Sequence, residues 1–507
     1  MVRSILDQAE ARPDLPFRFV DLSGEITETT LGKLVGESVS LAGSLHAHGL
    51  AEGDVVAIRG SNTLHYSRAL LAAVLGGFIA APLVSLLGDA DVTQLLRLAN
   101  AKILLSEASG PKRSLVRHLR ELADGGELDV VLLGNAPPHL DGAVRLPGDG
   151  EWHITDAKRR DDDAAFYIFT SGTTGTPKGV VHSYRSLYAE VSDLAAHLGL
   201  VDDGHQLQAF PLGHVAGLDN LLVSACLGRE MTMLSAWDAR PAADLIERYG
   251  ITTMAATPFY GTTLFDEFHA RGRRTTSLRT MLNGGGSVGS ALVRRGATFG
   301  IEVRRCYGSS EHPSATCHVP GASLALRSST DGRPTGGTRI RVVDDAGQDL
   351  PTGADGEILL SGGEQFTGYL PGTGDSITGD GWFRTGDIGR LSADGHLSVT
   401  GRKKDIIIRG GENISAAEVE QLLGGFPGIL EAAVVPVPDD RYGEKVGAFF
   451  VQDPGHATVD PDAVRAYFRR LGVAQHKAPE YLRSLDELPR NSLGKIQKHQ
   501  LPPLGPV

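Results

Sequence analysis

The chain has 507 residues and a formal net charge of −12, and 41% of its residues are hydrophobic. This length exceeds what one hydrophobic core usually supports, so we expect two or more domains, and the composition excludes a disordered or fibrous protein. Acidic and basic residues are interspersed, with acids in excess, which argues against a nucleic-acid-binding surface. Three cysteines without CxxC or Cys/His metal spacing exclude a disulfide framework and favour a reducing, cytoplasmic setting.

The N-terminal part of the chain shows no membrane or export signal. Its first residues lack the basic leader and apolar core of a secretory signal. Residues 69–87 carry no charge and approach the length that spans a bilayer. Gly76, Gly77 and Pro82 divide this run into a helix-sized and a strand-sized piece, so we predict a buried helix, turn and strand and no membrane span.

Apolar runs alternate with helix-like stretches through the first two thirds of the chain. Runs at 55–58, 130–133 and 166–169 predict strands that end at glycines or lead into a glycine-rich loop. This alternation favours an α/β fold with layered, mostly parallel sheets. From about 332 to 401, pairs of strand-like runs separated by turns predict a β-rich subdomain.

The segment after Gly401 predicts a separate small domain. It contains a strand at 406–408, a helix that starts near Ser415 with capping-box spacing, and a strand at 432–437. About one hundred residues suffice for an α+β domain of its own. The predicted organisation is a large N-terminal domain at 1–401, a hinge at 402–404 and a mobile C-terminal domain at 405–507.

A loop at 170–179, TSGTTGTPKG, directly follows a predicted strand. Its small residues let the backbone approach phosphate oxygens, its hydroxyls donate hydrogen bonds or bind magnesium, and Lys178 adds a positive charge. Pro177 precedes this lysine and Gly179 follows it, so the loop differs from the Walker pattern, and a P-loop kinase or ATPase is disfavoured. The loop chemistry favours a bound triphosphate, for which the candidate residues are Ser171, Gly172, Thr173, Thr174, Gly175 and Lys178.

Six further motifs follow the loop in chain order. They are PLGHVAG at 211–217, NGGG at 283–286, YGSSE at 307–311, GWFRTGD at 381–387, GRKKD at 401–405 and PRNSLGK at 489–495. Together with the loop they resemble, in order and over nearly the whole chain, the motifs of the adenylate-forming superfamily of AMP-dependent synthetases and ligases. The chain is most like a free-standing acyl-CoA or aryl-CoA synthetase, because only a short tail follows the last motif.

The resemblance implies that ATP and Mg²⁺ bind beside these motifs. Tyr307 would stack on adenine, Glu311 would bind Mg²⁺ together with Thr174, Asp387 would accept both ribose hydroxyls, and Arg402 would contact ribose and phosphate. Further implied nucleotide contacts are glycines and serines near strand ends: Gly284, Gly285, Gly286, Gly308, Ser309 and Ser310. The residues alone leave simpler roles open, because a tyrosine also suits a core and an aspartate also caps a turn.

The resemblance places the catalytic lysine and the moving parts near the C-terminus. Lys495 falls on the family's catalytic lysine, which bridges the substrate carboxylate and the α-phosphate. Lys404 falls on the hinge about which the small domain rotates, although Lys403 beside it carries the same charge. After that rotation, Gly410 and Gly411 would leave room for the narrow pantetheine arm of coenzyme A; a simple tight turn is the alternative role.

The acid-binding pocket is predicted beside Gly213, His214, Val215 and His312. Gly213 stands where the family often has a bulky aromatic residue, so we expect it to open room for a ring or a branched tail. His312 follows the magnesium glutamate and would meet a polar substituent of the substrate. His214 either contacts the substrate or only packs; peptide-synthetase adenylation domains have an aspartate there, and its absence argues against an α-amino acid substrate.

The predicted function is the ATP-dependent activation of a carboxylic acid to an acyl-adenylate, with release of pyrophosphate, followed by transfer to coenzyme A. The barrier is electrostatic, because two anions must meet in line. The catalytic candidates are Lys495, Glu311, Thr170 and His214. Transfer to a carrier protein, an amine or another acceptor stays open, as does activation of another small anion. A homodimer is a general expectation.

Two alternatives belong to other classes of protein. Residues 284–289 satisfy the GxGxxG pattern between a predicted strand and a predicted helix, and Glu302 follows at a distance typical of a dinucleotide-binding acid. A dinucleotide-dependent oxidoreductase would leave the loop at 170–179 and Lys495 unexplained. A non-catalytic descendant of the superfamily is disfavoured, because the chain retains together Lys178, Glu311, Asp387, Arg402 and Lys495.

Overall fold

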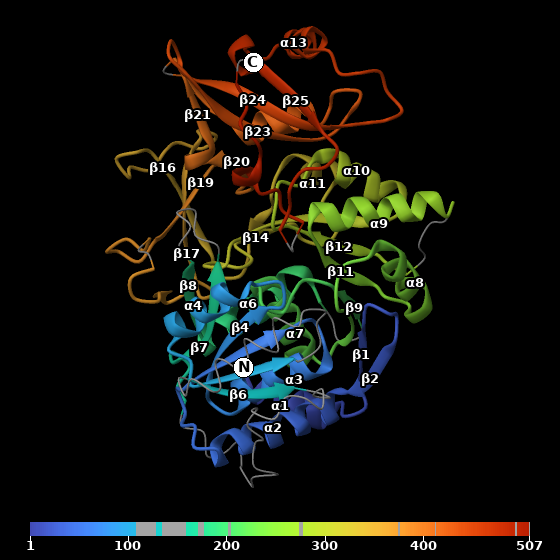
Figure 1. The fold of residues 1–507 in the computed structure, drawn as a ribbon, viewed down its shortest axis with the longest axis vertical. Helices are drawn as coiled ribbons and strands as arrows, with labels where there is room; N and C mark the ends of the chain where they lie inside the picture. Colours follow the sequence, from blue (N-terminus) through green and yellow to red (C-terminus); the bar gives the residue numbers. More distant parts are fainter. Residues whose placement is uncertain are drawn as a thin grey trace.

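The computed structural model describes residues 1–107, 128–133, 159–170, 177–200, 204–272, 277–373, 376–410, 412–491 and 494–505. The strands of these residues form four sheets, and Figure 1 shows the C-terminal sheet at one end of the molecule. Two large sheets flanked by helices, a four-stranded antiparallel sheet and the C-terminal sheet confirm the predicted fold class. Among the described residues, no helix has both the length and the apolar character needed to cross a bilayer.

A seven-stranded sheet carries the start of the glycine-rich loop. Its strand order is β18 (Gly368–Tyr369), β8 (Lys178–Ser183), β7 (Ala164–Thr170), β4 (Ile79–Val84), β3 (Val55–Gly60), β5 (Ile103–Glu107) and β6 (Asp129–Leu133). Strands β7, β4, β3, β5 and β6 run parallel, whereas β8 is antiparallel to β7. The uncharged run at 69–87 forms the end of α3 (Leu64–Leu75) and β4, as predicted.

Helices cover both faces of this sheet. One core cluster joins it to α2 (Leu31–Ala47), α3 and α6 (Tyr184–Leu198), and a second joins its other face to α4 (Asp89–Ala99). Ser183 caps α6, because its side chain accepts a hydrogen bond from the backbone N–H of Ser186. The sheet is therefore packed on both faces, and it holds β7 and β8, the two strands that the loop at 170–179 connects.

A nine-stranded sheet carries the NGGG and YGSSE motifs. Its strand order is β15 (Arg333–Pro334), β14 (Thr316–Cys317), β13 (Glu302–Tyr307), β12 (Thr280–Asn283), β11 (Thr253–Ala256), β9 (His205–Gln208), β10 (Glu230–Leu234), β1 (Pro16–Val20) and β2 (Ile26–Thr30). Strands β12 and β13 are parallel, so the motifs that follow Asn283 and begin at Tyr307 leave the same edge of the sheet.

The helices of this layer are α1 (Val2–Ala11), α7 (Val215–Leu227), α8 (Ala239–Tyr249), α9 (Pro258–Ala270), α10 (Ser290–Thr298) and α11 (Leu324–Ser329). Glu302 opens β13 at the end opposite Tyr307, and its carboxylate accepts from the guanidinium of Arg304 at 2.9 Å. A dinucleotide-binding acid belongs at the carboxyl end of its strand. The oxidoreductase alternative therefore lacks its ribose-binding acid.

The β-rich region is an antiparallel sheet of β16 (Arg339–Val343), β17 (Gly356–Ser361), β19 (Phe383–Leu391) and β20 (Leu397–Arg402), in that order. Strands β19 and β20 pair Asp387 directly with Arg402. Two motifs that are separate in the sequence thus become neighbours across one strand pair.

The chain from Lys403 onwards, which we name the C-terminal unit, follows the main body of described residues up to Arg402. A 3-10 turn, η2 (Lys403–Asp405), leads to a sheet in which β22 (Glu412–Ser415), β21 (Ile406–Arg409), β24 (Gly443–Gln452) and β23 (Ile429–Asp439) are neighbours, and β25 (Tyr481–Leu485) pairs with β24. Helices α12 (Ala416–Leu423) and α13 (Pro461–Arg470) complete a core cluster that contains residues of this unit alone.

Candidate active site

Three predicted nucleotide-binding residues from three strands contact one another. The hydroxyl of Tyr307 donates to Asp387 Oδ2 at 2.8 Å, and Arg402 Nε donates to Asp387 Oδ1 at 2.6 Å. Asp387 is only 4% exposed. Burial, followed by the charge of Asp387, raises the pKa of Tyr307 well above its usual value, so the phenol stays a neutral donor. The cluster combines a flat ring, an acceptor and a cation, which are the groups a nucleoside phosphate requires.

The loop that carries Glu311 is held from two sides. The hydroxyl of Tyr369 donates to Glu311 Oε1 at 2.7 Å. On the other side, His182 Nε2 lies 2.7 Å from the carbonyl oxygen of Ser310. Burial lowers the pKa of His182 to about 4, so this imidazole is neutral and donates through Nε2. A β-carbon at Gly308 would overlap the carbonyl of Pro313, so only glycine fits that turn.

The glycine-rich loop begins and ends on paired strands. Thr170 ends β7 and lies opposite Lys178, the first residue of β8. The ammonium of Lys178 lies 4.7 Å from the ring centroid of Tyr369. The predicted phosphate-binding residues between these strands, Ser171, Gly172, Thr173, Thr174 and Gly175, lie outside the described residues, so their roles stay predictions.

The nearby glycines at 284–286 follow β12. A β-carbon at Gly284 would lie 2.7 Å from the carbonyl oxygen of Cys306 on β13, so the glycine permits close approach of the two strands. Gly285 has a φ of 74°, and a β-carbon at Gly286 would meet Pro258 only at ordinary contact distance. The strand end is thus shaped without side chains beside Tyr307, whereas its contact with adenine stays a prediction.

Lys495 lies in a turn that the C-terminal unit presents to the main body. The turn is closed by hydrogen bonds between Asn491 and Lys495, one of which runs from the Lys495 N–H to Asn491 Oδ1 at 3.0 Å. A β-carbon at Gly494 would lie 2.8 Å from the ring of Phe259, and the guanidinium of Arg490 lies 5.2 Å from the centroid of that ring. The N-terminal turn of α9 therefore supports the predicted catalytic lysine.

Four cations from three segments interact electrostatically: Lys495 with Arg402 and Lys404, and Lys404 also with Lys178. Lys495 keeps solvent contact, yet the protein around its ammonium group lowers its pKa to about 8, and Arg402 and Lys404 act in the same direction. The pKa of Lys404 is likewise lowered, first by loss of solvent and then by Arg402, with Lys178 contributing. Cations that depress one another's protonation are stabilised by a bound polyanion.

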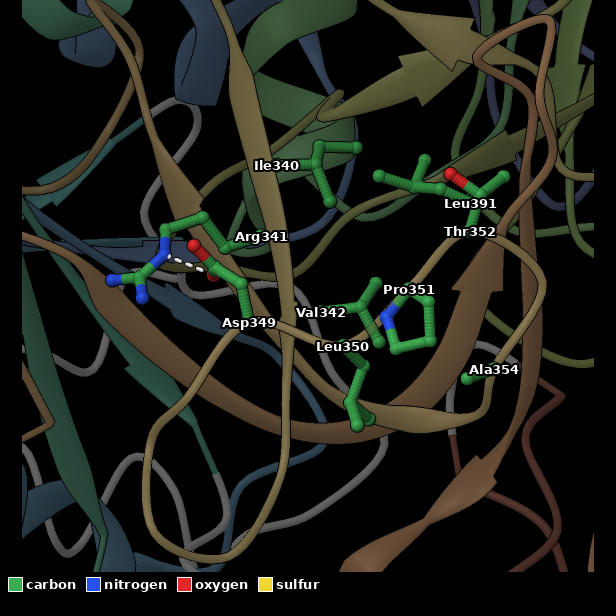
Figure 2. Close-up of a pocket in the computed structure, with 9 residues that line it drawn as sticks. All are labelled: Ile340, Arg341, Val342, Asp349, Leu350, Pro351, Thr352, Ala354 and Leu391. Carbon is green, nitrogen blue, oxygen red and sulfur yellow. Dashed lines mark hydrogen bonds and ion pairs between the residues drawn. The ribbon is translucent and has the colours of Figure 1, made fainter.

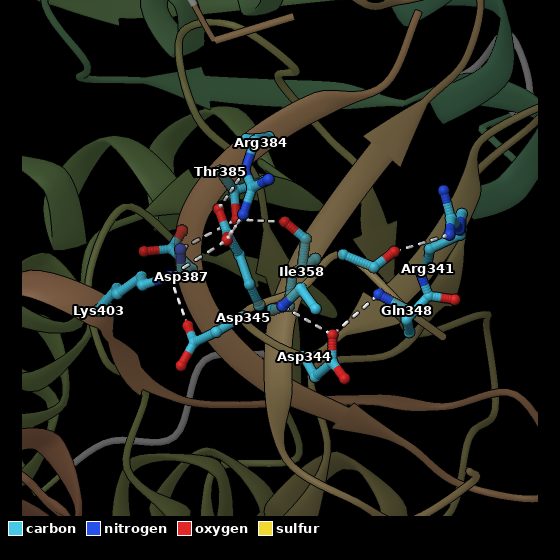
Figure 3. Close-up of polar contacts among 12 residues, drawn as sticks. Arg341, Asp344, Asp345, Gln348, Ile358, Arg384, Thr385, Asp387 and Lys403 are labelled. Atoms are coloured by element: carbon cyan, nitrogen blue, oxygen red, sulfur yellow. Dashed lines mark hydrogen bonds and ion pairs between the residues drawn. The ribbon is translucent and has the colours of Figure 1, made fainter. Parts of the chain in front are cut away.

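The two lysines of η2 face different surroundings. Lys403 Nζ donates to Asp345 Oδ1 at 2.8 Å, toward the turn between β16 and β17 (Figure 3). Lys404 instead interacts with the charges of Arg402 and Asp387. The hinge role of Lys404 stays a prediction, but Lys404 is the lysine of the two that is electrostatically coupled to the site.

Gly213 is buried for a reason that the sequence did not reveal. A β-carbon there would lie 2.7 Å from Val84 Cγ1 and 3.0 Å from Val84 N, so the glycine accommodates the end of β4. Val84 thus fills the space that a side chain at position 213 would take, and the expectation that Gly213 opens room for a ring or a branched tail stays a prediction. His214 and Val215 begin α7 and are half-buried, and burial lowers the pKa of His214 to about 4, which keeps the imidazole neutral.

His312 lies inside the protein. It is 0% exposed, its Nδ1 lies 3.7 Å from Glu364 Oε1, and its Nε2 would lie 3.3 Å from a β-carbon at Gly362. Glu364 in turn accepts from the hydroxyl of Thr338 at 2.6 Å and from the N–H of Ser314 at 3.2 Å. Two side-chain neighbours of His312, at positions 362 and 364, thus belong to the β-rich region, and its contact with a substrate stays a prediction.

The turn at Gly410 lies beside a cationic cluster. Gly410 has a φ of 60°, and its N–H donates to the carbonyl oxygen of Tyr442 at 2.8 Å. Three cations surround the Tyr442 ring, at 4.3 Å for Arg409, 5.1 Å for Arg441 and 5.8 Å for Lys445. The adjacent Gly411 lies outside the described residues. We name this group the Tyr442 cluster.

One pocket of about 200 Å³ lies away from these residues, on the β-rich sheet. Its lining, shown in Figure 2, is Ile340, Arg341, Val342, Asp349, Leu350, Pro351, Thr352, Ala354 and Leu391. Arg341 and Asp349 pair with each other at 2.6 Å, and the remaining lining is mostly aliphatic. The lining contains no aromatic ring to stack on a base, and its one cation is already paired with its one acid, so the pocket does not suit a nucleotide.

The fold brings the predicted nucleotide-binding residues of the main body next to Lys495 of the C-terminal unit. This arrangement is typical of an enzyme that binds a nucleotide. The sequence matches the AMP-binding enzyme family over residues 5–370 and the AMP-binding enzyme C-terminal domain over residues 418–495. The chain therefore belongs to the AMP-binding enzyme family.

Relatives of known activity span nearly the whole chain. A medium-chain fatty-acid–CoA ligase of Escherichia coli (strain K12) is 31% identical and covers 97% of this chain and 88% of its own length. Feruloyl-CoA synthase of Amycolatopsis sp. is 31% identical over 94% of both chains. A fatty acid–[acyl-carrier-protein] ligase of Streptomyces coeruleorubidus is 33% identical over 93% of this chain and 91% of its own.

Two solved structures share the fold along the whole chain. The o-succinylbenzoate coenzyme A synthetase of Bacillus subtilis, in complex with ATP and magnesium ion, matches with a TM-score of 0.82, 26% identity and coverage of 98% of each chain. ATP-bound MatB from Rhodopseudomonas palustris matches with a TM-score of 0.84, 27% identity and coverage of 98% and 97%.

Proposed function

We propose that the protein uses ATP to convert a carboxylic acid into an acyl-adenylate, releases pyrophosphate and then transfers the acyl group to the thiol of coenzyme A. The observation that carries this proposal is the arrangement around Asp387: Arg402 Nε donates to this carboxylate at 2.6 Å, Lys404 and Lys495 interact with its charge, and Lys178 interacts with Lys404. Such a group of cations suits two anions, a carboxylate and a triphosphate, that must approach each other.

The nucleoside part of ATP would bind beside Tyr307, Asp387 and Arg402. Asp387 already accepts one hydrogen bond on each oxygen, from Tyr307 and Arg402, so its orientation is fixed before ribose arrives. Remaining lone pairs on the same oxygens can accept ribose hydroxyls. The ring of Tyr307 is held by its own hydroxyl and offers a face for adenine.

Lys495 would bridge the attacking carboxylate and the α-phosphate. Its lowered pKa still leaves the ammonium mostly charged near neutral pH, and bound anions favour the charged form further. Holding both anions at one ammonium supplies orientation and neutralises the charge that develops in the transition state.

The residues present fit a magnesium ion. Mg²⁺ commonly binds through one or two carboxylates plus substrate phosphates, and Glu311 supplies a carboxylate held by Tyr369. In the described part of the chain, no group of three or more His, Cys, Asp or Glu side chains could hold an ion by itself. Mg²⁺, when bound, would neutralise charge on the triphosphate, and Thr174 stays a predicted partner.

The acceptor is supported by the Tyr442 cluster. Coenzyme A ends in a phosphorylated nucleotide, and the Tyr442 ring with its neighbouring cations suits an anionic, stacking group. Two of these cations also pair with acids, Arg409 with Glu480 and Lys445 with Asp439, each at 2.7 Å, so phosphate would share them with these carboxylates. A carrier protein is the second candidate, because one relative of 33% identity acts on an acyl-carrier protein.

The test is a panel of medium-chain, aromatic and alicyclic acids. We expect acid-dependent exchange of pyrophosphate into ATP without coenzyme A, and AMP release that coenzyme A accelerates. No exchange with any acid would contradict the adenylation step. Release that responds to a phosphopantetheinylated carrier protein and ignores coenzyme A would replace the proposed acceptor.

A further inference from the structure

Tyr369 lies on a strand that leaves the β-rich region and joins another sheet. Strand β18 pairs antiparallel with β8, with Tyr369 opposite Val180, and the next N–H, of Leu370, donates to the carbonyl oxygen of Gly179 at 2.7 Å. A β-carbon at Gly179 would overlap the side chain of Leu370, so that glycine makes the close approach possible. The backbone of Tyr369 is therefore fixed next to the end of the glycine-rich loop.

The Tyr369 side chain touches two groups that come from separate motifs. Its hydroxyl donates to Glu311 Oε1 at 2.7 Å, and its ring centroid lies 4.7 Å from the ammonium of Lys178. The same segment holds the Glu311 backbone, because the N–H of Phe366 donates to the carbonyl oxygen of Glu311 at 2.8 Å. One short segment thus contacts the predicted magnesium carboxylate and the predicted phosphate lysine.

The chemistry of the phenol suits this double contact. Burial and the charge of Glu311 raise the pKa of Tyr369, so the hydroxyl remains a donor. Ser376 Oγ donates to the Tyr369 hydroxyl at 3.3 Å, which orients the phenol proton toward Glu311. Oε1 of Glu311 then accepts the phenol proton, so Oε2 is the oxygen that Tyr369 leaves for a metal ion. The face of the Tyr369 ring attracts the ammonium of Lys178.

We propose that Tyr369 is a positioning residue that sets Glu311 relative to Lys178, and thereby sets the magnesium carboxylate relative to the triphosphate. The proposal rests on the proposed function in so far as both groups serve Mg²⁺ and ATP. Tyr369 itself acts through its two neighbours and needs no contact with either ligand.

Two variants separate the hydroxyl from the ring. Tyr369→Phe keeps the ring face for Lys178 and removes the donor to Glu311. We expect it to raise the half-saturating Mg²⁺ concentration in pyrophosphate exchange about tenfold, as the loss of one charge-assisted hydrogen bond predicts, with little change at saturating Mg²⁺. Tyr369→Leu removes both contacts and is expected to raise the KM for ATP as well.

A binding measurement gives a readout besides activity. Calorimetric titration with a non-hydrolysable ATP analogue, with Mg²⁺ or with a chelator, measures how much Mg²⁺ tightens nucleotide binding. We expect equal affinity of the wild-type protein and Tyr369→Phe without Mg²⁺, and a gain from Mg²⁺ that is about tenfold smaller in the variant. Tyr184→Phe is the matched control, because it removes another buried phenol hydroxyl, which donates to Val74 O at 3.1 Å.

The outcomes discriminate between the two proposals. An equal gain from Mg²⁺ in the wild-type protein and Tyr369→Phe, with melting temperatures unchanged, would overturn the positioning role. Weaker nucleotide binding by the variant in the chelator as well would also overturn it, since the effect would not be specific to Mg²⁺. No binding of the analogue by the wild-type protein would instead count against the proposed function.

Discussion

The main-body half of the candidate site and the C-terminal half are held by different kinds of contact. Tyr307 and Arg402 donate hydrogen bonds of 2.8 and 2.6 Å to Asp387, and Asp387 and Arg402 lie on paired strands. Lys495 lies on a turn that meets the main body through the ring of Phe259, against Gly494 and Arg490. A buried hydrogen-bonded cluster resists separation, whereas the contact of a single ring with a glycine and a guanidinium breaks at lower cost.

This difference suggests that the two halves of the site have different roles. The main body is organised to hold a nucleotide before the reaction begins, and the C-terminal unit supplies one cation through a contact that it can release. A detachable lysine is what a two-step reaction requires if the same unit must later present the Gly410 turn. The predictions below test whether the two halves respond differently to substitution.

Lys495→Ala should have the largest effect. Removing one preorganised charge typically costs about 100- to 1,000-fold in rate, and we expect pyrophosphate exchange to fall by that factor. Thioester formation from a presynthesised acyl-adenylate and coenzyme A should stay within about threefold of wild type, because that step no longer joins two anions. Lys498→Ala, which removes a lysine paired with Glu420 at 2.7 Å, is the control. Equal losses in both steps would refute a role confined to adenylation.

Asp387→Asn should have the next largest effect. The substitution keeps the shape but removes the charge that holds Tyr307 and Arg402 and accepts ribose, so we expect the KM for ATP to rise about 10- to 100-fold. Both half-reactions should suffer, because AMP stays bound through both. Asp394→Asn, in an exposed turn beside His396, controls for loss of a surface carboxylate. An unchanged KM for ATP would place ribose elsewhere.

The pH dependence of adenylation should report Lys495. Its ammonium is charged below a pKa of about 8 and neutral above it. We therefore expect kcat/KM for the acid to fall with rising pH, by about tenfold per unit above that value. Bound anions should raise the pKa of Lys495, so kcat should begin to fall at a higher pH than kcat/KM does. In Lys495→Arg the fall of kcat/KM at high pH should disappear from whatever activity remains, because the guanidinium stays charged. An unchanged fall in this variant would assign the titration to another group.

Much of the fold and the nucleotide half could be predicted because their signals are local. Tyr307 and Asp387 lie in short motifs at strands, and the alternation of strands and helices is visible along the chain. Tyr369 and Phe259 could not be predicted, because their roles depend on packing between segments far apart in the sequence. The packing of Gly213 could not be predicted for the same reason: its neighbour, Val84, belongs to a distant strand.

Phe259→Ala should have the smallest effect and is the most direct test of the contact between the halves. Loss of an aromatic contact worth about 1 kcal/mol should slow pyrophosphate exchange about fivefold, because the C-terminal unit then spends less time with Lys495 in place. Thioester formation from the presynthesised adenylate should be unchanged or faster. Phe299→Ala, which removes a ring packed at 5.4 Å from Phe265 within the main body, should lower the melting temperature without this split. If Phe259→Ala slowed both steps alike, its ring would serve the main body itself, and the C-terminal unit would be held in place by other contacts.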